Sequence, residues 1–571
     1  MTNLTYILFV LTIFFACKQK QIKHRVPVAE VRINQLGYYP GTVKKAVVAN
    51  TSAKDFALKT PSGETVFSGK LGSSSKWDKS GEELKIADFS KFSKKGKYFI
   101  YVDDLKDTCY FEISDKLYNQ AFKAALKSYY FIRASSDINE KYAGVYHRKG
   151  GHPDTMCYYH PSSGIGKGYM NSAKGWYDAG DYNKYIVNGG VTVGTLLATY
   201  NFMPELVGDN FSNIPESGNE KSDLLDEIKY ELDWVLTMQA PDGASYFKLS
   251  SKGFSGFLMP QKDKLERYVI GKSTASTLNF AAMTAMAARI YTGYDTVFAK
   301  KCKIAAEKAW KWAEKNPDIV YLNPKDVTTG QYSDTDFTEE FWWAAAELYL
   351  ATQKKEYADY LIEKEPLMTI EIGESWRVFL GNLGSFSILL NNNKLPESLK
   401  NKIKQKLFGA ADALLEKINK VPYRIPIDQF VWGSNSDIQN AAMILAYAYK
   451  FSDKQKYLDG VIETMDYIFG KNASAYSFMS GFGCKPVMHQ HNRISASDNI
   501  KAPIPGMISG GPNQNKEDDI SGTKFGVEYP DTFPAKCFID NQKSYASNET
   551  AINWNAPAVF VLGFLVNTME E

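Results

Sequence analysis

The chain carries almost no excess of either charge. Its 67 Lys and Arg residues face 64 Asp and Glu residues, and the net charge at pH 7 is +3. A protein that binds nucleic acid presents a basic surface to the phosphates, so this composition excludes that class. Hydrophobic residues make up 44% and charged residues 23% of the chain, which is typical of a folded globular protein.

Cysteine is also scarce, at 6 of 571 residues. With Cys17 set aside, the other five are scattered along the chain and odd in number, so they predict no disulfide framework. They are Cys109, Cys157, Cys302, Cys484 and Cys537.

The start of the chain lacks a long apolar run. The segment Tyr6–Ala16 is too short to cross a bilayer as a helix, and polar KQKQIKHR follows Cys17. This leader resembles a bacterial lipoprotein signal, with residues 1–17 as the signal, Cys17 as the lipidated N-terminus and residues 18–27 as a linker. We therefore expect export to the periplasm or cell surface of a bacterium, with membrane contact only through a lipid anchor. A plain secretion signal is the alternative.

Between residues 28 and 113 the pattern is short and strand-like. Val31–Asn34, Lys45–Ala49, Asp55–Leu58 and Lys97–Val102 are brief β-rich runs, and turn signals such as Pro61-Ser62-Gly63 separate them. Short strands with regular spacing predict a small β-sandwich.

Residues 114–571 have a different character, because long segments with helical apolar spacing take over. About twelve such segments in series suit an all-α (α/α)6 barrel, which makes the chain a multidomain protein. The long loops 144–175 and 471–548 lie between helices, and loops of this length usually carry function. The clearest helical segments are Leu117–Ala134, Val187–Met203, Leu224–Met238, Thr274–Tyr291, Phe337–Ala351, Val378–Leu390, Ile403–Ile418, Ile438–Tyr449 and Ala551–Leu565, with weaker ones near 297–315, 355–363 and 456–469.

The stretch GWYDAGDYNKYIVNGG (175–190) holds two carboxylates close together, Asp178 and Asp181, with aromatic rings around them. A solvated turn accounts for Asp and Gly here, and aromatic residues fill any core. A carboxylate pair that holds one water beside a flat, partly apolar ligand accounts for them equally.

Two later stretches also carry chemistry. SFMSGFGCKPVMHQHNRIS (477–495) places His491 and Arg493 two residues apart in a Gly-rich loop, where both side chains are able to donate hydrogen bonds to one ligand. FIDNQKSYASNETAINWNAPAVF (538–560) places Glu549 where an apolar helix is expected to open. An acidic residue there also complements the helix dipole without any catalytic role.

Together the three stretches resemble glycoside hydrolase family 9, the inverting β-1,4-glucanases. The spacing D-x4-Y-x3-E-x-A-x3-N-A around Glu549 is the most specific match, and INQLGYYPGTVKKAVV (33–48) resembles the start of the immunoglobulin-like domain that often precedes this catalytic domain. The resemblance implies an (α/α)6 barrel with an open cleft. It also implies that Glu549 is the general acid, that Asp181 is the general base and that Asp178 helps to hold the water. In inverting enzymes the acid and base stand roughly 6.5–9.5 Å apart, which leaves room for that water.

Substrate contacts are also implied. His491 and Arg493 carry over from the family pattern, although many members have a second histidine where this chain has Asn492. His489 is a candidate replacement for that contact. Pyranose rings stack on aromatic faces, and the candidate cleft walls are Trp176, Tyr182, Trp376, Trp432, Tyr545 and Trp554.

No cofactor is required for this chemistry, but two metal sites are considered. GQYSDTDFTEEFWW (330–343) resembles a structural calcium loop, with Asp334, Asp336, Glu339 and Glu340 as oxygen ligands, and an acidic helix start explains these residues equally well. His147, His152, Cys157 and His160 lie where some relatives bind zinc, but a single cysteine matches a four-ligand site poorly.

The expected function is hydrolysis of β-1,4-glucans by an exported, monomeric enzyme acting within the chain. No carbohydrate-binding module follows the Glu549 region, which favours soluble glucans or oligosaccharides over crystalline cellulose. An exo-acting hydrolase of short cello- or glucosamine-oligosaccharides is the alternative. A surface lipoprotein that binds glycans without activity is disfavoured, because Asp178, Asp181 and Glu549 are all present.

Overall fold

The computed structural model describes residues 30–105, 109–522 and 526–570. The predicted signal segment, the lipidation site Cys17 and the linker 18–27 lie outside the described residues.

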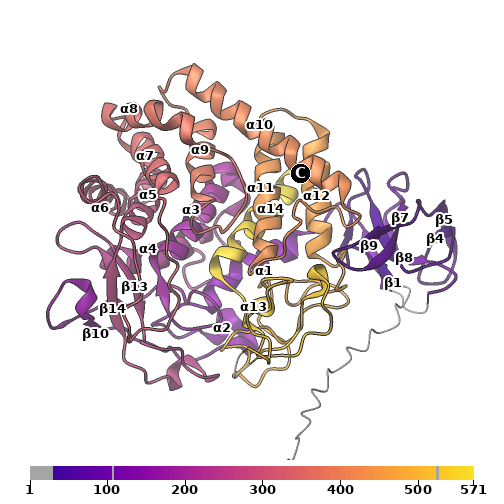
Figure 1. Ribbon diagram of the computed structural model, residues 1–571, viewed down its shortest axis with the longest axis horizontal. Coiled ribbons are helices and arrows are strands. Elements are labelled where there is room, and N and C mark those ends of the chain that lie inside the picture. The colour runs from indigo at the N-terminus through magenta and orange to yellow at the C-terminus, as the bar shows by residue number, and fades with distance from the viewer. Residues whose placement is uncertain (1–29, 106–108, 523–525, 571) are drawn as a thin grey trace, which may run out of the picture.

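The N-terminal domain is a sandwich of two β-sheets (Figure 1). One sheet has the strand order β1-β3-β7-β6 and the other β2-β9-β8-β4-β5. Apolar side chains such as Ala46, Val48, Leu58 and Ile100 fill the space between them. The predicted β-sandwich is confirmed. Its strands are β1 Glu30–Arg32, β2 Gly37–Tyr38, β3 Lys45–Ala49, β4 Asp55–Lys59, β5 Thr65–Lys70, β6 Ser75–Trp77, β7 Glu82–Asp88, β8 Gly96–Tyr101 and β9 Phe111–Ile113.

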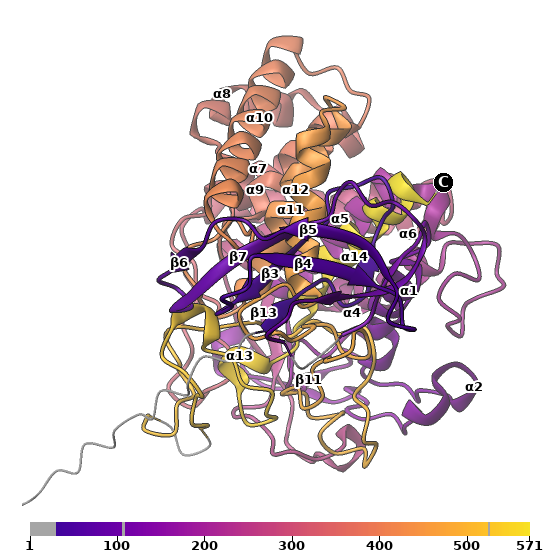
Figure 2. The ribbon, with the colours of Figure 1, turned by 90° about the vertical axis from the view of Figure 1, so that its right-hand side faces the viewer.

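Strand β3 is buried on both faces. Because successive side chains of a strand point to opposite sides, Ala46 and Val48 enter the sandwich core while Val47 and Ala49 point outward. The outward pair belongs to the core of the helical domain. The strand KAVVA has apolar side chains on both faces because it contributes to both cores. Figure 2 shows the sandwich lying directly in front of the helices.

Polar contacts reinforce this junction. Glu82 accepts a hydrogen bond of 2.9 Å from the Tyr423 hydroxyl, and Arg32 donates to the same carboxylate at 3.3 Å. Asn34 Nδ2 donates to Asp466 Oδ1 at 2.9 Å. The sandwich is thus held against the helical domain by buried polar contacts as well as by apolar packing.

Twelve long helices in the described part of the chain form two layers, as an (α/α)6 barrel requires. The more apolar helices, α3, α5, α7, α9, α11 and α14, form the inner layer, in which α14, α3, α5, α7 and α9 pack successively and α11 packs on α14. The predicted fold class is confirmed. The helices are α1 Asn119–Phe131, α3 Ile186–Phe202, α4 Asp223–Val235, α5 Thr274–Tyr291, α6 Thr296–Lys315, α7 Thr338–Thr352, α8 Lys355–Lys364, α9 Leu380–Leu390, α10 Glu397–Lys420, α11 Ser434–Lys450, α12 Gln455–Ile468 and α14 Ile552–Met569, with the short α2 Glu140–Ala143 and α13 Tyr545–Asn548.

Helix α5 illustrates how the sequence specifies an inner helix. It begins at a capping box, in which Ser273 and Ser276 satisfy each other's backbone amides. Its many alanines let the neighbouring helices α3, α6 and α7 approach closely. Helix α14 is the one described helix with the length and hydropathy of a membrane span, but 78% of that window is buried, so it is a core helix of the barrel.

A five-stranded sheet inside the helical domain is not predicted from the sequence. Its strand order is β11-β10-β14-β13-β12. The strands are two to five residues long and lie in or beside long loops, so no periodicity marks them. They are β10 Cys157–Tyr159, β11 Tyr169–Met170, β12 Lys184–Tyr185, β13 Tyr246–Ser250 and β14 Tyr268–Lys272. Strand β12 follows the Asp178–Asp181 stretch directly and so anchors it.

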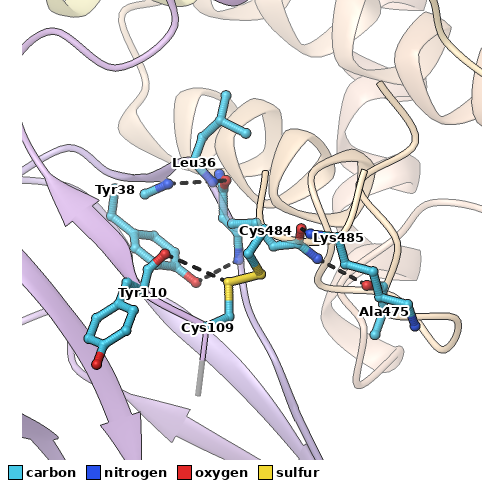
Figure 3. Close-up of a disulfide and its surroundings, with 10 residues drawn as sticks. Leu36, Tyr38, Cys109, Tyr110, Ala475, Cys484 and Lys485 are labelled. Atoms are coloured by element: carbon cyan, nitrogen blue, oxygen red, sulfur yellow. Dashed lines mark hydrogen bonds between the residues drawn. A yellow bond between two sulfur atoms is a disulfide. The ribbon is translucent and has the colours of Figure 1, made fainter. Parts of the chain in front are cut away.

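A disulfide between Cys109 and Cys484 joins the sandwich to the loop 471–548 (Figure 3). The Cα atoms are 6.1 Å apart, while the two residues are 375 positions apart in the chain. Beside the bond, the Gln35 side chain accepts from the Lys485 amide at 2.9 Å and donates to the Ala475 carbonyl at 3.0 Å. The scattered cysteines did not reveal this pairing, because spacing along the chain carries no information on a contact between remote domains.

Replacing Cys484 by Ser is expected to lower the free energy of unfolding by about 2–4 kcal/mol, because the unfolded chain gains the freedom that the cross-link removes. Scanning calorimetry in oxidising buffer should give a lower Tm for Cys484→Ser than for the wild type. Dithiothreitol should lower the Tm of the wild type to that of the variant and leave the variant unchanged. A wild-type Tm that does not respond to reduction would contradict the prediction.

Candidate active site

The Asp178–Asp181 stretch forms a tight loop between the core and β12. The Asp178 amide donates to the Asn183 carbonyl at 3.0 Å and closes the loop, while the Asp178 carbonyl accepts from the amide of Ile552 at the start of α14. Gly180 at its tip is indispensable for packing. A Cβ there would lie 2.2 Å from the carbonyl oxygen of His491 and 3.1 Å from the Glu549 carboxylate. The glycine lets three separated sequence stretches meet.

Asp178 is 1% exposed, and donors contact both of its carboxylate oxygens. Asn188 Nδ2, from the first turn of α3, lies 3.0 Å and 3.1 Å from its two carboxylate oxygens. The Tyr332 hydroxyl donates to Asp178 Oδ2 at 3.1 Å. Burial and the neighbouring Asp181 raise the pKa of Asp178 well above its usual range, and these donors oppose that rise.

Asp181 is 5% exposed, and its two oxygens differ. Oδ2 accepts from Asn183 Nδ2 at 2.5 Å and from the Tyr185 hydroxyl at 3.4 Å. Oδ1 has no hydrogen-bond partner among the described residues. Burial raises the pKa of Asp181, while Arg493 and Asn183 favour its charged form. Asp181 is thus a fixed carboxylate with one acceptor atom open.

The orientation of Asn183 follows from its other contacts. Its Oδ1 accepts from the Ser251 amide at 3.1 Å and from Arg267 Nη1 at 3.3 Å. Because both partners are donors at these atoms, the amide group must present its NH2 to Asp181.

Glu549 lies across the loop tip from this pair. It is expected to open a helix, but it sits in extended conformation, φ −72° and ψ 152°, between α13 and α14. Its Oε1 accepts from the Gly180 amide at 3.3 Å, and its backbone pairs with that of His491. Burial first, and then the charge of Asp181, raise the pKa of Glu549 well above its usual range. The group therefore retains its proton where an ordinary glutamate has lost it.

His491 is neutral, and its proton lies on Nδ1. Burial and the nearby Arg493 lower its pKa to about 4. Nδ1 lies 2.7 Å from the Gln542 carbonyl, which accepts only, so Nδ1 carries the proton and Nε2 is a bare acceptor. The sequence interpretation took His491 as a donor to a ligand hydroxyl, and the structure reverses that direction.

Arg493 holds the site together. Its Nη1 donates to the Gly180 carbonyl at 2.7 Å, and its Nε donates to the Ser255 carbonyl at 3.0 Å. Asn492 lies between His491 and Arg493, the two residues expected to bind substrate. Its side chain donates to Thr550 Oγ1 at 3.0 Å. His489 is exposed, and its amide donates to Asp540.

The predicted aromatic walls divide into two groups. Trp176 and Tyr182 are 1% and 2% exposed. The Trp176 indole donates a hydrogen bond to Glu227, and the Tyr182 hydroxyl donates to the Leu258 carbonyl. A sugar cannot stack on rings that are packed in this way, so these two assignments are corrected. Partly or well exposed rings remain, namely Trp376, Trp432, Tyr545 and Trp554.

Four residues of the site are missed by the sequence interpretation, namely Asn183, Tyr185, Asn188 and Tyr332. Tyr185 and Asn188 follow Asp181 closely, but a tyrosine and an asparagine beside a helix start carry no specific signal. Tyr332 lies in the stretch interpreted as a calcium loop, and its position is secured by Lys248. The Lys248 ammonium donates to the Gly330 carbonyl at 2.8 Å and to Thr329 Oγ1 at 3.0 Å.

The predicted metal ligands do not converge. No group of three or more His, Cys, Asp and Glu side chains in the described ranges is arranged to hold an ion. Asp334 and Asp336 accept from backbone amides of their own turn, and burial raises the pKa of Glu340, whose carboxylate oxygens have no partner in the part of the chain described. The structure thus gives no support for calcium in the part of the chain it describes, and the calcium loop stays a prediction. Of the zinc candidates, His152 contacts Tyr177 and Asp263, while His160 contacts Asp326.

The site thus pairs two buried carboxylates with a third, partly exposed one across a glycine tip. Residues 118–562 match the family described as "Glycosyl hydrolase family 9", and residues 27–107 match "Cellulase N-terminal ig-like domain". The chain belongs to glycosyl hydrolase family 9. The resemblance seen in the sequence is confirmed.

Relatives of this family 9 chain cover nearly all of it. A xyloglucan-specific endo-beta-1,4-glucanase, BoGH9A, from Bacteroides ovatus is 40% identical over 94% of this chain and 93% of its own length. Endoglucanase D from Acetivibrio thermocellus is 34% identical over 94% of this chain and 84% of its own. A solved Bacteroides ovatus GH9 structure has a TM-score of 0.87 at 38% identity and covers 94% of this chain and 99% of that one. The protein is a glycoside hydrolase with an N-terminal immunoglobulin-like domain.

Proposed function

We propose that this family 9 enzyme hydrolyses internal β-1,4-glucosidic bonds of a glucan with inversion at the anomeric carbon. One observation carries the proposal. Asp181 keeps one buried carboxylate oxygen without a partner among the described residues, and Arg493 and Asn183 favour its charged form. Burial and the charge of Asp181 raise the pKa of Glu549, on the other side of Gly180, well above its usual range. Two carboxyl groups in opposite protonation states are what inverting hydrolysis needs.

In this mechanism Asp181 Oδ1 accepts one proton of a water molecule while Asp178 orients the other. The water oxygen attacks the anomeric carbon from the face opposite the leaving group. Glu549 gives its proton to the glycosidic oxygen as the C–O bond breaks, and the bonding electrons leave with that oxygen. The turnover ends with Asp181 protonated and Glu549 ionised, and exchange with solvent restores both.

The donors around the pair have defined tasks. Asn188 and Tyr332 hold Asp178, so its carboxylate does not rotate away from the water. Asn183 fixes Asp181 through Oδ2 and leaves Oδ1 for the proton. His491 presents its bare Nε2 to a sugar hydroxyl beside Glu549, to which its backbone is paired.

The relatives support a β-1,4-glucan as substrate. BoGH9A is named for xyloglucan, and several others are named endoglucanases. A cellulose 1,4-beta-cellobiosidase and a cellodextrinase, 34% and 32% identical, support the exo-acting alternative. Glucosamine oligomers receive no support from these names.

The test follows viscosity, reducing ends and product anomers by NMR on barley β-glucan, carboxymethyl cellulose, xyloglucan and cellohexaose. We expect an early fall in viscosity and α-anomers as the first products. Slow viscosity loss with one small product would favour the exo-acting alternative, and β-anomers as first products would contradict inversion.

Export is part of the proposal. The Cys109–Cys484 disulfide belongs in an oxidising compartment, which agrees with the leader before residue 18. Lipidation at Cys17, the periplasmic or cell-surface location and the monomeric state remain predictions.

A further inference from the structure

Two phenylalanines beside the catalytic carboxyl groups have no part in the mechanism above. Phe254 and Phe257 are 51% and 41% exposed, although both lie in the segment 251–267 that joins β13 to β14 inside the site. Exposed apolar side chains grouped among polar residues mark places where a ligand binds.

The segment that carries them is fastened to the catalytic loop. The Ser251 amide donates to Asn183 Oδ1, and the Leu258 carbonyl accepts from the Tyr182 hydroxyl at 2.6 Å. Between these points Arg493 bridges the Ser255 carbonyl and the Gly180 carbonyl. The two rings therefore keep a fixed position relative to Asp181, and their exposure does not come from a loose loop.

Phe257 also extends a row of rings. Its centroid lies 5.3 Å from that of His491, which lies 6.1 Å from Tyr545, which lies 5.4 Å from Trp432. The rings come from four separate segments, and Trp432 at the far end is 41% exposed. Because the His491 backbone pairs with that of Glu549, the row passes beside the proton donor.

We propose that Phe254 and Phe257 form a glucose-binding subsite at the end of this row opposite Trp432. The phenyl faces stack on the apolar C–H face of a pyranose ring. Because phenylalanine has no hydroxyl group, these rings form no hydrogen bonds with the sugar hydroxyls. The Arg493 guanidinium lies 5.8 Å and 5.7 Å from the two ring centroids and packs against both rings. This inference rests on the proposed function and deepens it, because the pair makes the enzyme favour long chains over short ones.

The test compares Phe254→Ala, Phe257→Ala and the double variant with the wild type on cellohexaose. Each single change should raise KM about three- to tenfold and leave kcat within about twofold, which is the size expected for one lost ring contact. Phe257→Tyr should restore the wild-type KM, since it keeps the ring. Tyr294→Ala, at a 40% exposed ring after α5, is the control and should change neither constant.

A second measurement is independent of turnover. In the Glu549→Gln background, calorimetric titration with cellohexaose should show a Kd weakened by the same factor when Phe254 or Phe257 is replaced by Ala. Unchanged KM and Kd in an active enzyme would overturn this inference alone, and so would a loss confined to kcat, which would make the rings mere supports of His491. A wild type that cleaves none of the glucans would overturn the proposed function together with this inference.

Discussion

Glu549→Gln is expected to lower kcat on cellohexaose by about 10²- to 10⁴-fold, the usual contribution of a general acid. The amide has nearly the shape of the carboxyl group but gives no proton to the departing oxygen. An aryl cellobioside whose phenolate leaves without a proton should lose far less. Glu397→Gln, at an exposed position that starts α10, is the matched control and should retain wild-type kcat on both substrates.

The pH profile gives a second readout of the same residue. Burial and Asp181 raise the pKa of Glu549, and the acid works only while protonated. In the wild type, kcat/KM should fall as the pH rises through that raised pKa, and it should fall on the acidic side as Asp181 becomes protonated. With the aryl substrate the Gln variant should lose the alkaline fall and keep the acidic one. A variant that still shows both limbs would remove Glu549 from the role of acid.

Asp181→Asn is expected to abolish turnover on cellohexaose and on the aryl cellobioside by similar factors, again about 10²- to 10⁴-fold. Both substrates should be affected, because the attacking water must lose a proton regardless of the leaving group. Azide needs no deprotonation, so it should restore turnover and form an α-glycosyl azide, which NMR identifies. A large difference between the two substrates would contradict the role of base.

The same variant should be more stable than the wild type at high pH. Burial raises the pKa values of Asp178, Asp181 and Glu549 in the folded state, and Asp181 adds charge repulsion to the other two. A group with a raised folded pKa contributes its stability below the unfolded pKa, and that contribution is lost as the pH rises through the folded value. The Tm advantage of Asp181→Asn should therefore be small in acid and grow toward alkaline pH.

The cluster of three carboxyl groups that the proposal uses was predictable because its residues lie in dense, short-range patterns. Asp178, Asp181 and Glu549 are recognised within stretches of a few residues, and the inner helices by their apolar character. Tyr332 was not predictable, since it reaches Asp178 from 154 positions away through a loop shape that leaves no periodic signal. Trp176 shows the converse error: nearness to Asp178 in the chain does not reveal which way a ring faces, and this one faces the core.

The five-stranded sheet of the helical domain was not predicted for a related reason. Strands such as β11 and β12, two residues each, are defined by their partners and not by their own composition. The same holds for the disulfide, whose two halves lie 375 positions apart.

The double burial of β3 constrains how the chain becomes a protein. During synthesis Val47 and Ala49 are made early, whereas the α12 region and loop 471–548, which the sandwich contacts, are made much later. Contacts of such long sequence separation form late. Until the helical domain is made, the apolar face of β3 that carries Val47 and Ala49 therefore stays exposed to solvent. A sandwich domain expressed alone would be prone to self-association through this face. Removing the sandwich would leave Tyr423 without Glu82 and Asp466 without Asn34, so neither domain can be exchanged freely.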